Sequence, residues 1–307
     1  MNKSGFRIIF LGTPDFAVAS LKKLVENNWN IVAVVTAPDR PSGRGQKLAS
    51  SPVKQYAELK SIPVLQPTNL KDSQFISGLK KLKADLQIVV AFRMLPREVW
   101  QMPRLGTFNL HASLLPNYRG AAPINWAIIN GEKETGVTTF FLKHEIDEGE
   151  ILMQEKEPIS PEDTASDLHS RLMLKGADLV SQTLSLIFEG KANPQEQILS
   201  GKEKNAPKLS KEMCHINWNS SSKNIVNQIR GLSMYPGAWC EINGIQYKIY
   251  KASALEAGKE FNPGSIISDR KNFLHIATND GIISILEIQK EGKRKMGIKE
   301  FLLGNKI

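Results

Sequence analysis

The stretch RIIFLGTPDFAVASLKKLVENNWNIVAVVT, residues 7–36, decides the fold. Its opening apolar run, Arg7–Leu11, predicts a buried strand, and the turn residues Gly12–Asp15 follow it. Apolar residues then recur with helical spacing over Phe16–Glu26, and Ile31–Thr36 predicts a second strand. A strand, a helix and a strand in this order form a βαβ unit, from which parallel sheets are built.

Further apolar runs, separated by helical patterns, extend this sheet. They are Pro63–Leu65, Leu86–Phe92, Phe108–His111 and Val137–Leu142, and Thr164–Phe188 is expected to be one long helix. Because strands and helices alternate, we expect a doubly wound, mostly parallel, Rossmann-like α/β domain.

The pattern changes after Glu189, where polar and turn-forming residues replace the apolar periodicity. We therefore expect a first domain over 1–189, a linker over 190–207 and a second domain over 208–307. A helix over Ser222–Gly231 and short strands separated by Gly, Asn and Pro predict a small OB-like β-barrel there. The strands expected are Ala238–Ile242, Gln246–Ala252, Gly264–Ser268, Leu274–Ala277 and Gly281–Gln289.

The composition is that of a globular chain, because 41% of the 307 residues are hydrophobic. No apolar run is long enough to span a bilayer, and the N-terminus lacks the apolar region of a signal peptide, so we expect a cytoplasmic protein without a membrane partner. Cys214 and Cys240 have neither metal-ligand nor disulfide-framework spacing. We expect no bound metal.

The charge is basic and unevenly distributed. The net charge is +9, and the last 100 residues carry 15 Lys and Arg against 9 Asp and Glu. Clustered basic residues are typical of a protein that binds a polyanion, with nucleic acid as the leading candidate. A well-solvated surface would explain the same charge.

The strand Phe108–His111 carries two polar residues, Asn109 and His111, in alternate positions. Because side chains alternate between the faces of a strand, these two point the same way while Phe108 and Leu110 face the packing. Ligands bind at the carboxyl ends of parallel strands, which is where this pair lies. An amide donor and an imidazole that titrates near neutral pH suit acyl transfer.

The segment Pro38–Leu48 is longer than most connections between a strand and a helix, and it carries three cations, Arg40, Arg44 and Lys47. Glycines on both sides of Arg44 would let the backbone approach a phosphate chain closely. A flexible surface loop is the alternative interpretation.

Several motifs in this order resemble the methionyl-tRNA formyltransferase family from end to end. They are Gly12–Phe16, Pro38–Pro41 with Gly43–Gly45, Asn109–Pro116, Arg119–Pro123, Lys208–Lys211, Ile216–Trp218 and Ala277–Gly281. The Asn-x-His strand alone indicates only the broader group of enzymes that use 10-formyltetrahydrofolate, among them a purine-pathway formyltransferase, a formyltetrahydrofolate hydrolase and a sugar-nucleotide formyltransferase. The Arg44 loop and the basic C-terminal domain favour the tRNA enzyme.

The resemblance implies transfer of the formyl group of 10-formyltetrahydrofolate, a consumed co-substrate, to the α-amino group of methionine on initiator tRNA. It also implies that Asn109 donates to the developing oxyanion, that His111 moves protons and that Asp147 supports the imidazole. Spacing alone would not select Asp147, because three glutamates lie within three residues of it.

The resemblance further implies that Ser113, Leu114, Leu115 and Pro116 contact the folate, and that Arg40, Arg44 and Lys47 contact tRNA. The segment Ala91–Pro96 departs from the family pattern, which has Ala-Tyr-Gly and one more residue. We expect a monomer. Two other hypotheses stay open: an enzyme that acts on a small formylated or formyl-accepting molecule, and a tRNA-binding protein without catalysis.

Overall fold

The structure is a computed structural model that describes residues 2–42, 47–255, 261–305 and 307. The chain forms two compact units that interleave along the sequence. The first comprises Met1–Arg119, Gly136–Glu157 and His169–Lys204, and the second comprises Gly120–Thr135, Pro158–Leu168 and Asn205–Ile307. The domain boundaries expected from the sequence stay a prediction, because compactness alone does not define a unit that folds by itself.

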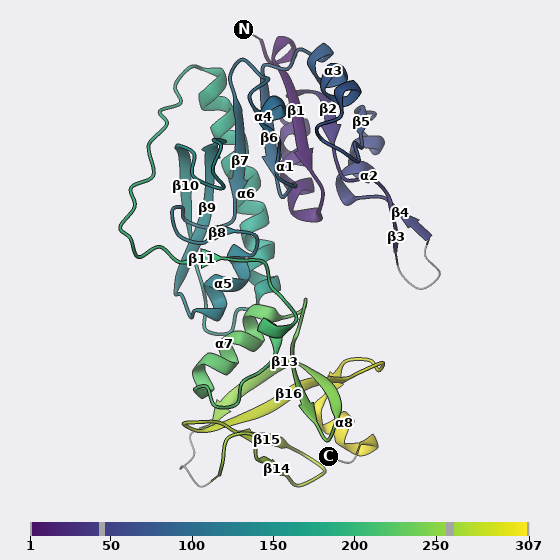
Figure 1. The fold of residues 1–307 in the computed structure, drawn as a ribbon, viewed down its shortest axis with the longest axis vertical. Coiled ribbons are helices and arrows are strands. Elements are labelled where there is room, and N and C mark those ends of the chain that lie inside the picture. Colours follow the sequence, from purple (N-terminus) through teal and green to yellow (C-terminus); the bar gives the residue numbers. More distant parts are fainter. Residues whose placement is uncertain (1, 43–46, 256–260, 306) are drawn as a thin grey trace. The chain divides into compact units, whose positions relative to one another are not determined.

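A seven-stranded sheet, in the order β10-β9-β7-β6-β1-β2-β5, is the framework of the first unit (Figure 1). Its strands are β1 (Arg7–Gly12), β2 (Asn30–Val35), β5 (Val64–Leu65), β6 (Leu86–Val90), β7 (Thr107–His111), β9 (Glu134–Phe141) and β10 (Ile151–Pro158). The pairs from β5 to β7 are parallel, and β7 pairs with β9 in the antiparallel direction. The predicted mostly parallel sheet is therefore confirmed. Because β2 and β6 flank β1, strand order reverses beside β1, where such folds bind ligands.

Helices cover both faces of this sheet, as expected for a doubly wound fold. They are α1 (Asp15–Glu26), α2 (Pro52–Leu59), α3 (Ser73–Lys81), α4 (Arg97–Trp100) and α6 (Ala165–Phe188). On one face, Leu11 of β1 shares a buried cluster with Leu79 of α3 and Val99 of α4. On the other face, Leu110 of β7 lies so close to Gly176 of α6 that a Cβ there would be 2.7 Å from its side chain. Each fully buried aliphatic side chain contributes about 1.5–3 kcal/mol.

Local sequence sets where these helices begin. Ser51 accepts a hydrogen bond from the Lys54 N–H and is followed by Pro52 at the first helical position of α2. Asp72 accepts in the same way from the Phe75 N–H at the start of α3. At the end of β1, Gly12 is required because a Cβ would lie 2.7 Å from the Cβ of Ala17 in α1.

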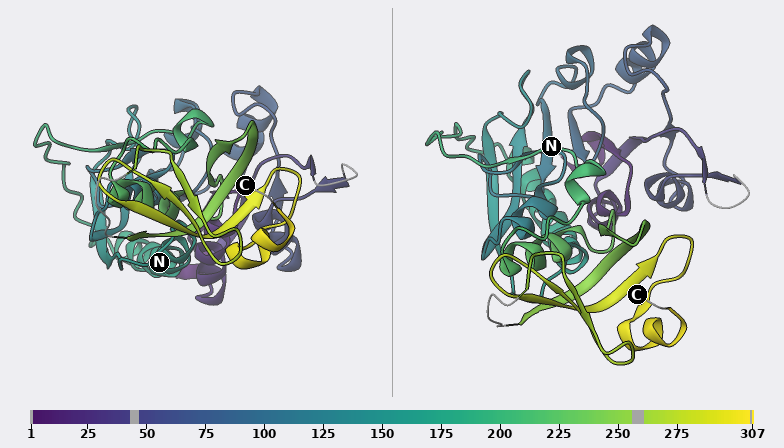
Figure 2. Two further views of the ribbon diagram at one scale, coloured as in Figure 1. Left: turned by 90° about the horizontal axis from the view of Figure 1, so that it is seen from below. Right: turned by 60° about the horizontal axis from the view of Figure 1, so that its bottom comes forward.

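The segment expected to be a loop between β2 and α2 contains a hairpin. Its strands are β3 (Arg40–Ser42) and β4 (Lys47–Ala49), which pair antiparallel with Pro41 opposite Leu48. The hairpin strands extend outward from the parallel sheet in every view (Figures 1 and 2).

The second unit is built on a curled antiparallel sheet in the order β12-β13-β16-β15-β14, with β17 paired to β16. Its elements are β12 (Ala238–Ile242), β13 (Ile245–Leu255), β14 (Ile266–Ser268), β15 (Leu274–Ala277), β16 (Ile282–Lys290), β17 (Met296–Gly297), α5 (Pro123–Ile129), α7 (Ser222–Leu232) and α8 (Ile298–Gly304). Ile229 of α7 and Phe301 of α8 share one buried core with the sheet. This arrangement confirms the expected OB-like fold.

Short elements complete the chain: η1 (Lys3–Gly5), η2 (Glu212–Cys214), β8 (Arg119–Gly120) and β11 (Asn205–Ala206). Within the described residues, no helix combines the length and apolarity needed to cross a membrane.

Candidate active site

Strand β7 places Asn109 and His111 on one face of the sheet. Asn109 lies opposite Val89, a member of the cluster under α3 and α4. The alternate residues of the strand, Phe108 and Leu110, are 0% and 4% exposed. The alternation expected from the sequence is therefore present, and the strand ends at His111.

The His111 imidazole is buried, and its Nε2 lies 2.8 Å from the backbone carbonyl oxygen of Tyr118. A carbonyl oxygen can only accept, so Nε2 carries the proton and donates it. In the neutral ring Nδ1 is then the unprotonated nitrogen. The fold thus leaves Nδ1 as the atom that can take up a proton.

Asp147 faces that nitrogen from the loop between β9 and β10. Its Oδ2 lies 3.8 Å from Nδ1 of His111, and its side chain is 13% exposed. This distance exceeds a direct hydrogen bond, but it places the carboxylate beside the ring nitrogen that carries no proton in the neutral imidazole. The pair is therefore arranged to accept a proton at Nδ1 and to stabilise the resulting charge.

The loop that carries Asp147 has an unusual backbone. Asp147 has a φ of 56°, in the left-handed region. Two residues later, a Cβ on Gly149 would lie 1.5 Å from the carbonyl oxygen of Phe141, so only glycine fits. The close contact of the Gly149 backbone with β9 therefore fixes the position of the loop just before β10 begins.

The Asn109 side chain is half-buried, and none of the described residues forms a hydrogen bond with it. Its amide N–H groups are therefore available to a ligand. An amide donor beside a proton-accepting imidazole can stabilise negative charge on an oxygen while the imidazole takes a proton.

In the turn after β7, the four residues predicted to contact the folate differ in burial. Ser113 is fully buried, and its Oγ donates to the Asn117 carbonyl at 2.6 Å. Leu115 is also buried, and its N–H donates to Oγ1 of Thr138 at 3.2 Å. Leu114 and Pro116 are half-buried. The predicted contacts of Ser113 and Leu115 would thus use the backbone, whereas Leu114 and Pro116 have side-chain surface to offer.

The hairpin carries two of the three predicted tRNA contacts among the described residues. Arg40 is exposed on β3, and Lys47 begins β4, whereas Arg44 lies outside the described residues. No described residue accepts a hydrogen bond from the Arg40 guanidinium. Burial lowers the pKa of the Arg93 guanidinium, and the positive charge of Arg40 lowers it further. Two repelling cations of this kind form a favourable place for an anion.

Asp39 anchors the base of the hairpin. Its Oδ2 accepts from Lys54 Nζ at 2.6 Å and its Oδ1 from Gln66 Nε2 at 2.8 Å. The hydrogen bond from Lys54, followed by that from Gln66, lowers the pKa of the Asp39 carboxyl. The Asp39 carboxylate therefore has Lys54 and Gln66 as its partners and does not pair with the guanidinium of Arg40.

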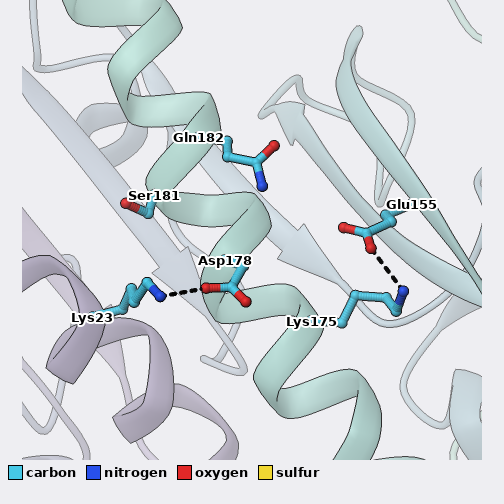
Figure 3. Close-up of a pocket in the computed structure, with 6 residues that line it drawn as sticks. All are labelled: Lys23, Glu155, Lys175, Asp178, Ser181 and Gln182. Atoms are coloured by element: carbon cyan, nitrogen blue, oxygen red, sulfur yellow. Dashed lines mark hydrogen bonds and ion pairs between the residues drawn. The ribbon is translucent and has the colours of Figure 1, made fainter.

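A cavity of about 480 Å³ opens between α1, α6 and β10 (Figure 3). Its charged side chains pair with each other, Lys23 with Asp178 at 2.6 Å and Lys175 with Glu155 at 2.7 Å. None of its lining residues is among those predicted to act in catalysis. Because the charges are already neutralised in pairs, this cavity offers less chemistry than the end of β7.

Sequence reasoning did not assign roles to three residues around this site. They are Tyr118, whose carbonyl holds His111, and Arg119 and Gln197, which contact the Asp147 loop. Arg119 lies in a quoted motif, but nothing in the pattern singles out a backbone carbonyl or one glutamine of a polar segment. In the described part of the chain, no group of three or more His, Cys, Asp or Glu residues is arranged to hold a metal ion.

Family models match both parts of the chain. The model described as formyl transferase matches residues 6–184, and that described as formyl transferase, C-terminal domain, matches residues 208–306.

Curated relatives match over nearly the whole chain. A methionyl-tRNA formyltransferase of Bacteroides fragilis is 52% identical over 312 residues, covering 99% of this chain and 96% of the relative. One from Parabacteroides distasonis is 52% identical over 316 residues, covering 100% of this chain and 98% of the relative.

Solved structures share the fold. An N-formyltransferase from Helicobacter canadensis, in complex with folinic acid and dTDP-3-aminofucose, matches with a TM-score of 0.68 and 25% identity over 93% of this chain and 99% of its own. HypX from Aquifex aeolicus, in complex with tetrahydrofolic acid, matches with a TM-score of 0.66 and 20% identity over 97% of this chain and 47% of its own.

Proposed function

This chain belongs to the formyl transferase family, and from that premise we infer that it transfers a formyl group to the α-amino group of methionine on initiator tRNA. The observation that carries this conclusion is the 52% identity to methionyl-tRNA formyltransferases over almost the full length, including the basic C-terminal part. The product is N-formylmethionyl-tRNA, which serves translation initiation. The formyl donor is a folate derivative, and we propose 10-formyltetrahydrofolate. We also propose that the enzyme acts in the cytoplasm as a monomer.

Asn109 and His111 on β7, together with Asp147, have different roles in this transfer. The folate supplies an activated formyl carbonyl, which the methionine amine attacks. The Asn109 amide, which has no partner among the described residues, donates to the formyl oxygen as negative charge develops there. His111 takes the amine proton at Nδ1, and the facing Asp147 carboxylate stabilises the imidazolium. The proton then passes to the departing folate nitrogen.

The reaction is tested by following labelled formyl from 10-formyltetrahydrofolate to RNA. Methionylated initiator tRNA is compared with methionylated elongator tRNA, uncharged tRNA and a reaction without RNA. We expect transfer only to charged initiator tRNA, and a rate that falls steeply with salt because phosphate contacts release counterions. Folate deformylation without RNA would instead identify a hydrolase or a small-molecule enzyme. RNA binding without transfer would identify a tRNA-binding protein.

We propose that the hairpin contacts the tRNA and that Arg40 binds a phosphate. Arg40→Ala should weaken tRNA binding and reduce the slope of log K against log salt by about one, as expected when one phosphate contact is lost. The measurement is tRNA affinity at several salt concentrations. Arg97→Ala is the matched control, because Arg97 is an exposed arginine on α4 that donates to Gln101. An unchanged salt slope for Arg40→Ala would remove this residue from the interface.

A further inference from the structure

The segment after α6 runs along the edge strand β10 before it continues into β11 (Figure 1). Gln195 and Ile151 of β10 exchange backbone hydrogen bonds of 2.7 and 2.8 Å. The polar composition of residues 190–207 predicts only a linker, yet residues 190–204 belong to the first unit. The segment is therefore bound to the unit that carries His111.

Gln197 extends from this segment onto the loop that carries Asp147. Its Nε2 donates to the carbonyl oxygens of Asp147 and Gly149, each at 2.8 Å. Its Oε1 accepts from Nη2 of Arg119 at 2.7 Å and from Nε at 3.2 Å. Because carbonyls only accept and a guanidinium only donates, these partners fix the orientation of the amide.

Arg119 belongs to the same hydrogen-bond network. Its Nη1 donates to Oε1 of Glu148 at 2.7 Å, and its side chain is mostly buried. Arg119 follows Tyr118, whose carbonyl holds Nε2 of His111. Gln197 therefore links the loop that faces Nδ1 to the turn that holds Nε2.

We propose that Gln197 is a positioning residue for formyl transfer, which holds the Asp147 carboxylate opposite His111 by clamping the backbone on both sides of Glu148. This inference rests on the proposed function. The loop needs such support, because its neighbouring residues 143–146 are exposed and Asp147 itself has a left-handed backbone. A backbone of this kind persists only where surrounding contacts determine it.

Gln197→Glu tests the clamp with a side chain of the same shape. The oxygen facing Arg119 is kept, but an oxygen that cannot donate replaces Nε2 opposite the two carbonyls. We expect kcat for formylation of methionyl-tRNA to fall about 10- to 100-fold, as for residues that orient a reacting side chain. KM for both substrates should stay unchanged. Gln195→Glu is the matched control, since Gln195 is exposed and its side chain donates only to the Asn193 carbonyl at 3.4 Å.

A double-mutant cycle separates positioning from general stability. If Gln197 acts through Asp147, Gln197→Glu should have no further effect on kcat in an Asp147→Asn background. Additive losses, or a Gln197→Glu protein with the parent kcat, would overturn the inference while leaving the proposed function intact. A parent protein that transfers no formyl group would overturn the proposed function itself, together with the role assigned to Gln197.

Discussion

His111→Ala is expected to lower kcat for formyl transfer about 10²- to 10⁴-fold, the range that a positioned general acid–base group contributes. The loss follows from the geometry of the ring. Nε2 donates to the Tyr118 carbonyl, so Nδ1, opposite Asp147, is the atom that we propose takes up the amine proton. Single-turnover transfer of labelled formyl to methionylated initiator tRNA measures the chemical step directly, without the contribution of product release.

His144→Ala is the control for this variant. His144 lies three residues before Asp147, but its side chain is 83% exposed. The His144→Ala protein should keep the parent single-turnover rate. Thermal unfolding of both variants shows whether the buried His111 site still folds at the assay temperature. A folded His111→Ala protein that keeps most of the parent single-turnover rate would contradict the assigned role.

The parts of the fold that bury apolar residues could be predicted from the sequence, and the rest could not. Strands β1 and β6 are covered on both faces, so their apolar runs are nearly continuous. In contrast, β10 is an edge strand in which only Glu157 is buried, and its charged second half gives no apolar pattern that would predict a strand. The hairpin β3–β4 also lacks an apolar pattern, because it stands away from the core.

The candidate site shows the same limit. The Asn109 and His111 pair follows from strand alternation, which depends only on spacing along one element. Asp147 reaches the same place through a loop with a left-handed residue and a glycine that no other residue can replace, and neither feature is visible as a pattern. The family resemblance supplied Asp147. Gln197 had no such signal, because its contacts are to backbone carbonyls and residues distant in sequence.

Asn109→Ala should lower kcat about 10²- to 10³-fold, the loss seen when one donor to a developing oxyanion is removed. The half-buried amide is aimed at no described residue, so removing it breaks no bond of the folded protein. The free energy of unfolding should therefore change little, whereas the transition state loses a donor. Asn109→Asp should be at least as impaired, because a carboxylate repels the negative charge that the amide stabilises.

Asn30→Ala is the matched control for this loss. Asn30 is a half-buried asparagine at the start of β2, paired with Arg7 at the amino end of the same parallel sheet. Its amide donates to the Ser4 carbonyl at 2.6 Å, so the variant loses a structural hydrogen bond but no contact at the strand ends where we propose that transfer occurs. Asn30→Ala should therefore lower the free energy of unfolding and keep kcat, whereas Asn109→Ala should lower kcat and keep the free energy of unfolding. An Asn109→Ala protein that raises KM and keeps kcat would show that the amide binds substrate and transition state equally, and would move it from catalysis to binding.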